Sequence, residues 1–303
     1  MLTTLGLSLL IGLALGLLGG GGSILTVPML VYVLHTEPKQ AIVTSFVVVG
    51  ISSLMALIPH ARRNTVCWKS GLLFGVAGMA GAFSGSRLAV GFPSQLLMLM
   101  FGLISLTIGL LMLRGRGVKP ADVAPAQALG SCPLHLPLLR VLFDGFWVGG
   151  LTAMVGVGGG FMIVPAMTLL IGLPMQAAVG TSLLVIAMNA AAGLIGYGQH
   201  MQLDLGFTAL VAAGTVSGSF LGAWCSRFIS PSVLRRSFAV MVILVAVYVL
   251  SQTLTNELVE LLESWLMDKV ILGKVAVALL LLWLLGLIAY WVHKIDGMVL
   301  VVR

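Results

Sequence analysis

The chain has 303 residues, of which 59% are hydrophobic and 8% charged, and its mean hydropathy is +1.14. Because soluble domains carry about 25% charged residues, this composition excludes soluble enzymes, nucleic-acid-binding proteins and fibrous proteins. The formal net charge of +7 is therefore interpreted as a topology signal and as contact with anionic lipids.

Long apolar runs separated by short polar joints predict an all-α polytopic membrane protein. The N-terminal sequence has neither a basic region nor a small-residue cleavage site, so we expect it to be retained. The longest joint, residues 114–139, carries three basic residues and four prolines and is the natural linker between two halves. In chain order, the predicted apolar segments are 4–18, 24–34, 41–59, 70–91, 95–113, 141–155, 161–173, 177–197, 206–229, 234–252 and 270–292.

The two halves repeat each other without a gap. Pro28 and Pro165 lie 137 positions apart, and the same offset superimposes glycines, a Thr-Ser pair and a G-x3-G pattern. An internal duplication explains this register better than chance, and such repeats are characteristic of secondary transporters. We therefore divide the chain into a first membrane repeat (1–113), a cytoplasmic linker (114–139), a second membrane repeat (140–252), and an acidic interfacial helix with an extra transmembrane helix (253–303).

The distribution of Lys and Arg predicts that the repeats are inverted. The joint at 60–69 carries Arg62, Arg63 and Lys69, whereas its counterpart at 197–206 has neither Lys nor Arg. The joint at 92–95 has none either, but basic residues bracket its counterpart near 230. Since basic loops stay in the cytoplasm, we expect the N-terminus and the segment 253–268 outside, and the linker and the C-terminus inside.

Inversion requires an odd number of crossings in each half. The two short segments at 4–34 would then form a re-entrant pair that reverses at the sequence GGGG, residues 19–22. At 1.5 Å per residue these segments are shorter than the ~30 Å hydrocarbon core, so the glycines are expected at membrane depth. Each repeat thus contains about five membrane segments, the first two short and meeting at a Gly-rich turn.

These glycines are interpreted as an anion site. Glycine adopts positive φ and leaves its N–H groups accessible to a ligand. Proline fits best in the first turn of a helix, so helices beginning near Thr26 and Ile163 would direct free N–H groups and positive dipole ends at the turns. The alternative is that the glycines only allow close helix packing, which we prefer for isolated cases such as Gly81 and Gly85.

Polar residues downstream extend the predicted site. The hydroxyls of the Thr-Ser pairs could bind an oxyanion or bond to carbonyls of their own helix, and Asn189 could contact substrate or a neighbouring helix. The predicted substrate-binding residues are Gly20, Gly21, Gly22, Ser23, Thr44, Ser45, Gly158, Gly159, Gly160, Thr181, Ser182 and Asn189.

Neither catalysis nor metal binding has a motif here. HExxH, GxSxG, Walker sequences and paired carboxylates are absent, so we expect no enzyme activity, cofactor or metal. Cys67, Cys132 and Cys225 are odd in number and widely spaced, which argues against a disulfide framework.

The sequences GGGGSILTVP and GVGGGFMIVP, each followed by a Thr-Ser pair, resemble the TauE/SafE family. The resemblance covers roughly residues 5–252 and implies a bacterial inner-membrane permease that exports sulfite, organosulfonates or other small organic anions. Ser23 stands where the second repeat has Gly160, so the two half-sites differ.

The sequence thus favours a secondary transporter of small anions that works by alternating access. An anion channel, a permease for small carboxylates and, third, a membrane enzyme are the alternatives. The expected partners are a small anion and membrane lipid, with no nucleic acid, and the C-terminal helix could form a homo-oligomer.

Overall fold

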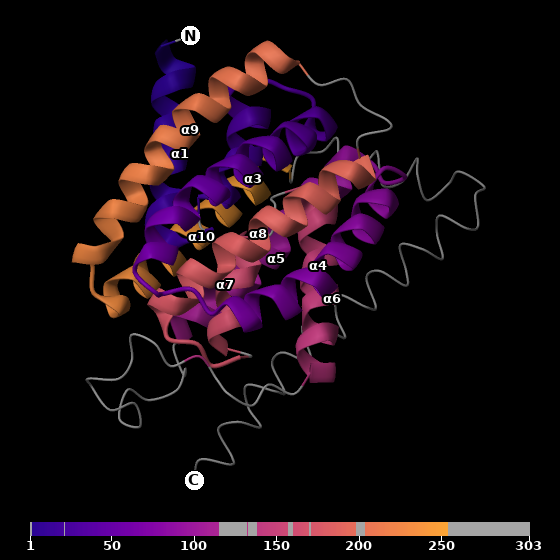
Figure 1. Cartoon of the computed structure of the whole chain (residues 1–303). Coiled ribbons are helices and arrows are strands. Elements are labelled where there is room, and N and C mark those ends of the chain that lie inside the picture. The colour runs from indigo at the N-terminus through magenta and orange to yellow at the C-terminus, as the bar shows by residue number, and fades with distance from the viewer. Residues whose placement is uncertain are drawn as a thin grey trace. The chain divides into compact units, whose positions relative to one another are not determined.

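The computed structural model describes residues 2–20, 22–114, 132, 138–156, 160–169, 171–197 and 204–253. They form helices joined by short turns, without a strand among these residues (Figure 1). The chain divides into two compact units, Met1–Leu250 and Ser251–Arg303. The predicted acidic helix and extra transmembrane helix fall outside the described residues, so the account below concerns the first unit.

The helices reproduce the predicted segments up to residue 253. In order they are α1 (Leu2–Leu18), α2 (Ser23–Pro28), the π-helix η1 (Met29–Val33), α3 (Pro38–Arg62), α4 (Trp68–Ala89), α5 (Ser94–Arg114), α6 (Leu138–Val155), α7 (Gly160–Leu169), α8 (Met175–Tyr197), α9 (Leu205–Cys225), the 3-10 turn η3 (Ser226–Phe228) and α10 (Pro231–Thr253).

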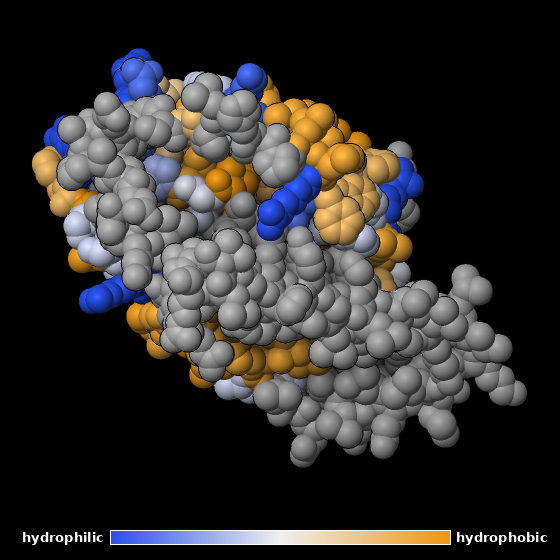
Figure 2. Space-filling view, turned by 90° about the horizontal axis from the view of Figure 1, so that it is seen from below, coloured by the Kyte–Doolittle hydropathy of each residue, from blue (hydrophilic) through white to orange (hydrophobic). Residues whose placement is uncertain are grey.

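Seven helices of the described part are long and apolar enough to cross a membrane: α3, α4, α5, α6, α8, α9 with η3, and α10. The first helix and the α2–η1 segment are apolar but shorter. Large apolar side chains are also exposed, such as Leu10, Val76 and Leu244, each more than half accessible. On the face seen in Figure 2, apolar residues cover much of the coloured surface. These features confirm a polytopic α-helical membrane protein.

The helix order repeats with the spacing found in the sequence. Shifting α1 to α5 by 137 positions places them on α6 to α10, with boundaries that agree within two residues when α2 and η1 are taken together. Contacts between the halves are reciprocal as well: α1 packs on α9, and α6 packs on α4. Each half therefore completes its core with a helix of the other half.

Glycines make these exchanged contacts close. A Cβ at Gly81 would collide with the backbone of Phe146, and one at Gly218 would collide with the backbone of Leu9, which lies 137 positions before Phe146. Small residues let membrane helices approach backbone to backbone. The packing role expected for the G-x3-G pattern agrees with these contacts.

Helices α3 and α8 occupy equivalent places in the two repeats and cross each other near their middles. A Cβ on Gly50 would lie 3.2 Å from the Cβ of Ala190, and the Phe46 ring lies beside Gly193. From the Phe46–Gly193 contact to the Gly50–Ala190 contact, residue numbers rise along α3 and fall along α8. These equivalent helices therefore run antiparallel where they meet.

Basic side chains fasten helix ends on one face. The Arg63 guanidinium donates to the carbonyl of Ala223 near the end of α9, at 3.2 Å, and Arg235 donates to the carbonyl of Met112 near the end of α5, at 3.4 Å. Cations at helix C-termini are favoured by the helix dipole. The joint after α3, the end of α9, the start of α10 and the end of α5 therefore lie on the same face.

Candidate functional site

The first Gly-rich turn reverses the chain. Gly19 and Gly20, directly after α1, have φ of +64° and +130°, a region that side chains with a Cβ rarely adopt. Gly22 then lies against α1, where a Cβ would collide with the backbones of Leu15 and Ile11. A straight helix would carry residue 22 about 16 Å beyond Ile11, so the chain folds back here, as the sequence predicts.

Within the reversal expected at residues 19–22, the positive φ values belong to Gly19 and Gly20. Gly22 has helical φ and ψ of −65° and −26° and packs on α1, so its role in the turn is close packing and not a left-handed backbone. In the second repeat the positive φ of +78° belongs to Gly156, which lies 137 positions after Gly19. Both Gly19 and Gly156 were absent from the predicted site, although the duplication had already paired them. Gly21, Gly158 and Gly159 lie outside the described residues.

The two short helices begin earlier than their prolines suggest. Helix α2 begins at Ser23 and α7 at Gly160, three residues before Thr26 and Ile163. Pro28 therefore ends α2 instead of opening it. The chain continues past Pro28 as the π-helix η1, in which Leu34 N–H donates to the Met29 carbonyl, five residues back.

The starts of α2 and α7 nonetheless meet. A Cβ on Gly20 would lie 2.6 Å from Cα of Gly160, and one on Gly160 would lie 2.6 Å from Oγ of Ser23. Ser23 itself donates to the carbonyl of Gly20, at 2.6 Å. We call this contact of Gly20, Ser23 and Gly160 the glycine junction. It brings three predicted site residues together from both repeats, with no space for a larger side chain.

Two serines hold the turns of the opposite repeat. Ser45 Oγ contacts the Gly156 carbonyl, and Ser182 Oγ contacts the Gly19 carbonyl, so equivalent serines contact equivalent glycines. Each hydroxyl also lies within hydrogen-bond distance of a carbonyl three residues back in its own helix. In this conformation both serine side chains lie on backbone carbonyls, so they position the turns.

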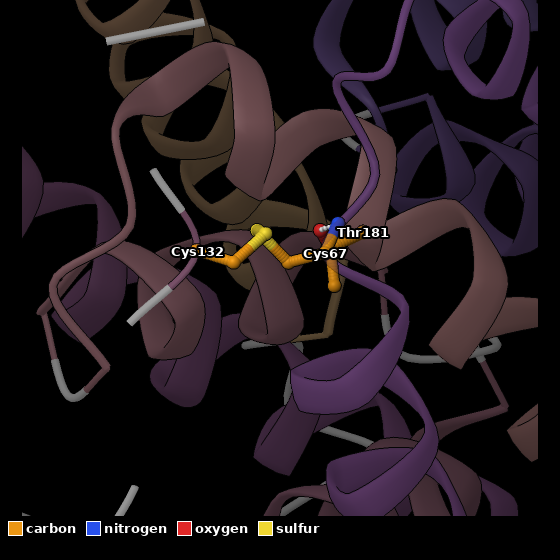
Figure 3. The surroundings of a disulfide bond; sticks show 3 residues. All are labelled: Cys67, Cys132 and Thr181. Carbon is orange, nitrogen blue, oxygen red and sulfur yellow. Dashed lines mark hydrogen bonds between the residues drawn. A yellow bond between two sulfur atoms is a disulfide. The ribbon is translucent and has the colours of Figure 1, made fainter. Parts of the chain in front are cut away.

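The threonines that precede these serines are also buried, with Thr44 2% and Thr181 0% exposed. Thr181 Oγ1 accepts a 2.9 Å hydrogen bond from the backbone N–H of Cys67, the residue before α4 (Figure 3). A hydroxyl that accepts can still donate its own hydrogen, so Thr181 keeps one donor.

Cys67 is bonded to Cys132 in a disulfide, with a Cα–Cα distance of 5.6 Å (Figure 3). The expectation against disulfides was therefore wrong for this pair. The spacing of the cysteines in the sequence did not predict this disulfide, because the fold brings together two residues that are 65 positions apart. The bond attaches the linker to the α3–α4 joint, next to Thr181.

Asn189 is 1% exposed, and neither side-chain atom has a hydrogen-bond partner in the described part of the protein. Its amide lies against α4, where a Cβ on Gly78 would come within 2.6 Å of Oδ1. The same offset places Asn189 on Ser52, whose Oγ is also buried without a partner. The sequence therefore contained a polar equivalent of Asn189 that the prediction missed.

Comparison with known proteins agrees with this architecture. The family model described as "Sulfite exporter TauE/SafE" matches residues 4–249. The chain belongs to the TauE/SafE family. A protein of Xylella fastidiosa (strain Temecula1), named "probable membrane transporter protein", is 36% identical over 253 residues, covering 82% of this chain and 95% of the relative. No solved structure matches the chain.

More distant relatives carry similar names. The "probable membrane transporter protein YdhB" of Bacillus subtilis is 27% identical over 227 residues, covering 75% of this chain and 90% of the relative. A Haemophilus influenzae protein with the same general name is 24% identical over 270 residues, covering 82% and 98%. The TauE/SafE protein described here is thus a multi-pass membrane transporter.

Proposed function

We propose that this transporter carries small anions, with sulfite or organosulfonates such as sulfoacetate as substrates and export as the direction. The family description names sulfite export, whereas the relatives' names state no substrate. The composition of the described core agrees with a small anion, because its buried polar residues are mostly Ser and Thr. Neutral donors of this kind suit a mono- or dianion more than a highly charged ligand.

The observation that carries the proposal is the glycine junction. Gly20 and Gly160, one from each repeat, meet where two short helices begin at the end of a chain reversal. Non-helical backbone at membrane depth is tolerated where it is buried in protein or lines a cavity. In secondary transporters such interrupted segments, duplicated in the two repeats, point to the substrate site. Gly21, Gly158 and Gly159 adjoin this contact in the sequence and complete the proposed site.

Alternating access between inverted repeats is the proposed mechanism. The antiparallel contact of α3 with α8 and the exchanged packing of α1 and α6 support it. The location of Arg63 and Arg235 on one face also supports this mechanism, because it agrees with the distribution of basic joints along the sequence. We place the protein in the inner membrane, with a periplasmic N-terminus and a cytoplasmic C-terminus.

Counterflow in proteoliposomes tests the function. Purified protein is reconstituted, the vesicles are loaded with unlabelled sulfite, and uptake of 35S-sulfite is measured against protein-free vesicles. We expect saturable uptake that internal substrate stimulates and that sulfoacetate inhibits more strongly than small carboxylates. Ohmic currents without counterflow would instead establish a channel, and preference for a cation or a neutral sugar would refute the proposal.

A further inference from the structure

Two unsatisfied polar positions at the centre of the molecule are related by the repeat. Asn189 Oδ1 and Nδ2 and Ser52 Oγ are buried without hydrogen-bond partners in the described part of the protein. Asn189 is residue 15 of α8 and Ser52 is residue 15 of α3. Both lie beside the point where these helices cross, at Gly50 and Ala190. The unpaired groups are therefore duplicated near the middle of two membrane-spanning helices.

Their surroundings are equivalent as well. Asn189 lies between α8 and α4, with its amide against Gly78. Ser52 lies where α3 meets α9, because Ser219 Oγ of α9 donates to the Ser52 carbonyl, at 3.2 Å. Helices α4 and α9 are themselves equivalent. Ser53, the next residue, also has an unpaired hydroxyl, but its counterpart is Ala190, so only Ser52 and Asn189 form a polar pair.

Packing alone does not account for these side chains. A buried polar group without a partner destabilises the folded protein, whereas an apolar group of the same shape carries no such penalty. Leucine has nearly the shape of asparagine and suits a membrane helix. Polar groups left unpaired at this depth are therefore expected to have a ligand in another step of the cycle.

We infer that Asn189 and Ser52 are a second pair of substrate contacts, which donate hydrogen bonds to the transported oxyanion as it passes the middle of the membrane. The inference rests on the proposed function. It adds Ser52 to the predicted substrate-binding residues and pairs it with Asn189 at a place away from the glycine junction. Each lies seven positions, or about 10 Å along its helix, after the serine that holds a turn. The Asn189 amide and the Ser52 hydroxyl are neutral donors. They can therefore bind an anion more weakly than a charged side chain would, so that the anion is released again.

The test separates transport from stability. Asn189→Leu and Ser52→Ala are purified, and thermal unfolding and sulfite counterflow are measured for each. Since a hydrogen bond to a charged group is worth roughly a tenfold change or more, we expect kcat/KM to fall at least tenfold for Asn189→Leu and about tenfold for Ser52→Ala. The unfolding temperature should stay equal or rise, because each variant removes an unpaired buried group.

Ser8→Ala is the matched control. Ser8 is fully buried, but its hydroxyl is paired, donating to the Thr4 carbonyl at 2.7 Å. This variant should lose some stability and transport normally. Asn189→Ser, which gives both repeats the same residue, keeps the inference testable if Asn189→Leu folds poorly. It should retain more transport than Asn189→Leu or Asn189→Ala, and equal loss in all three would contradict a hydrogen-bonding role.

Two results would overturn the inference. Asn189→Leu with wild-type counterflow would show that substrate does not use the amide, while a lower unfolding temperature in step with lost transport would show a structural role. Either result leaves the proposed function intact if wild-type protein transports sulfite. Failure of wild-type protein to transport any anion would instead refute the proposed function.

Discussion

Ser182 of α8 contacts the carbonyl of Gly19, at the turn where the opposite repeat reverses direction. The equivalent contact, from Ser45 to Gly156, repeats it on the other side. A carbonyl at the end of an interrupted helix needs a partner inside a membrane protein. Each repeat thus supplies the hydroxyl that the other repeat's turn requires, which couples the two Gly-rich turns.

Removing either serine hydroxyl should therefore destabilise the protein by a similar amount. We expect Ser45→Ala and Ser182→Ala each to lower the free energy of unfolding by about 1–3 kcal/mol, because a buried carbonyl loses a partner. Ser84→Ala is the control, since its exposed hydroxyl bonds only within its own helix. Unfolding in detergent, followed by circular dichroism, measures the difference. Unchanged stability in both variants would show that the reciprocal contacts do not couple the repeats.

The glycine junction should tolerate no side chain. Gly20→Ala places a Cβ at φ of +130°, and Gly160→Ala places one against Gly20. Backbone strain of this kind costs about 1–3 kcal/mol, so we expect folded protein with less than a tenth of wild-type counterflow. Transport is measured per amount of monodisperse protein.

Gly6→Ala is the control for this pair, because nothing lies within 4 Å of a Cβ at Gly6 and its φ is not positive. It should transport normally and be slightly more stable, since alanine is the better helix former. Normal counterflow by Gly20→Ala and Gly160→Ala at normal yield would refute the site.

Some parts of the fold and of the candidate site could be predicted from the sequence, and others could not. Hydrophobic periodicity and the 137-residue offset were enough for the helices, the duplication and the reversal at residues 19–22, because these depend on local composition. The start of α2 was placed too late because Pro28 was treated as a residue of the first helical turn. In the structure Pro28 is the last residue of α2, and η1 follows it.

Contacts between distant segments were not predictable. The pairing of Cys67 with Cys132 and the contact of Ser182 with Gly19 depend on tertiary packing, which leaves no local pattern. Ser52 is a different case, since the known offset pointed to it from Asn189 and only an unpaired hydroxyl in the structure makes the equivalence meaningful.

Glycines at the exchanged helix contacts should behave differently from those at the junction. Gly81→Val and Gly218→Val bring side chains against the backbones of Phe146 and Leu9, and overpacking of this kind costs about 1–3 kcal/mol or more. We expect low yield and a reduced unfolding temperature, with residual transport proportional to the folded fraction. Gly91→Ala, where the nearest atom would lie at 3.5 Å, is the control. Full yield with abolished transport would instead assign these glycines to the substrate path.

The Cys67–Cys132 pair tests the orientation of the protein. The bond joins residues 65 positions apart, so in the chain-entropy model it stabilises the fold by about 4 kcal/mol when it forms. The same face carries Arg62, Arg63 and Lys69, which predict a cytoplasmic location, and thiols in the cytoplasm stay reduced. We therefore expect both cysteines to be free in growing cells and to pair after purification without reductant.

Alkylation of intact cells before lysis, followed by mass analysis in a Cys225→Ser background, measures the state of the two thiols. Cys132→Ser, which cannot form the bond, provides the reduced reference and should unfold at the temperature of the wild-type protein in reductant. Two alkylated cysteines in cells, and a higher unfolding temperature after oxidation, would agree with the predicted topology. A disulfide already present in cells would place the α3–α4 joint in the periplasm. The orientation of every helix would then be reversed, because the hydrogen bonds of Arg63 and Arg235 hold the other basic joints on that same face.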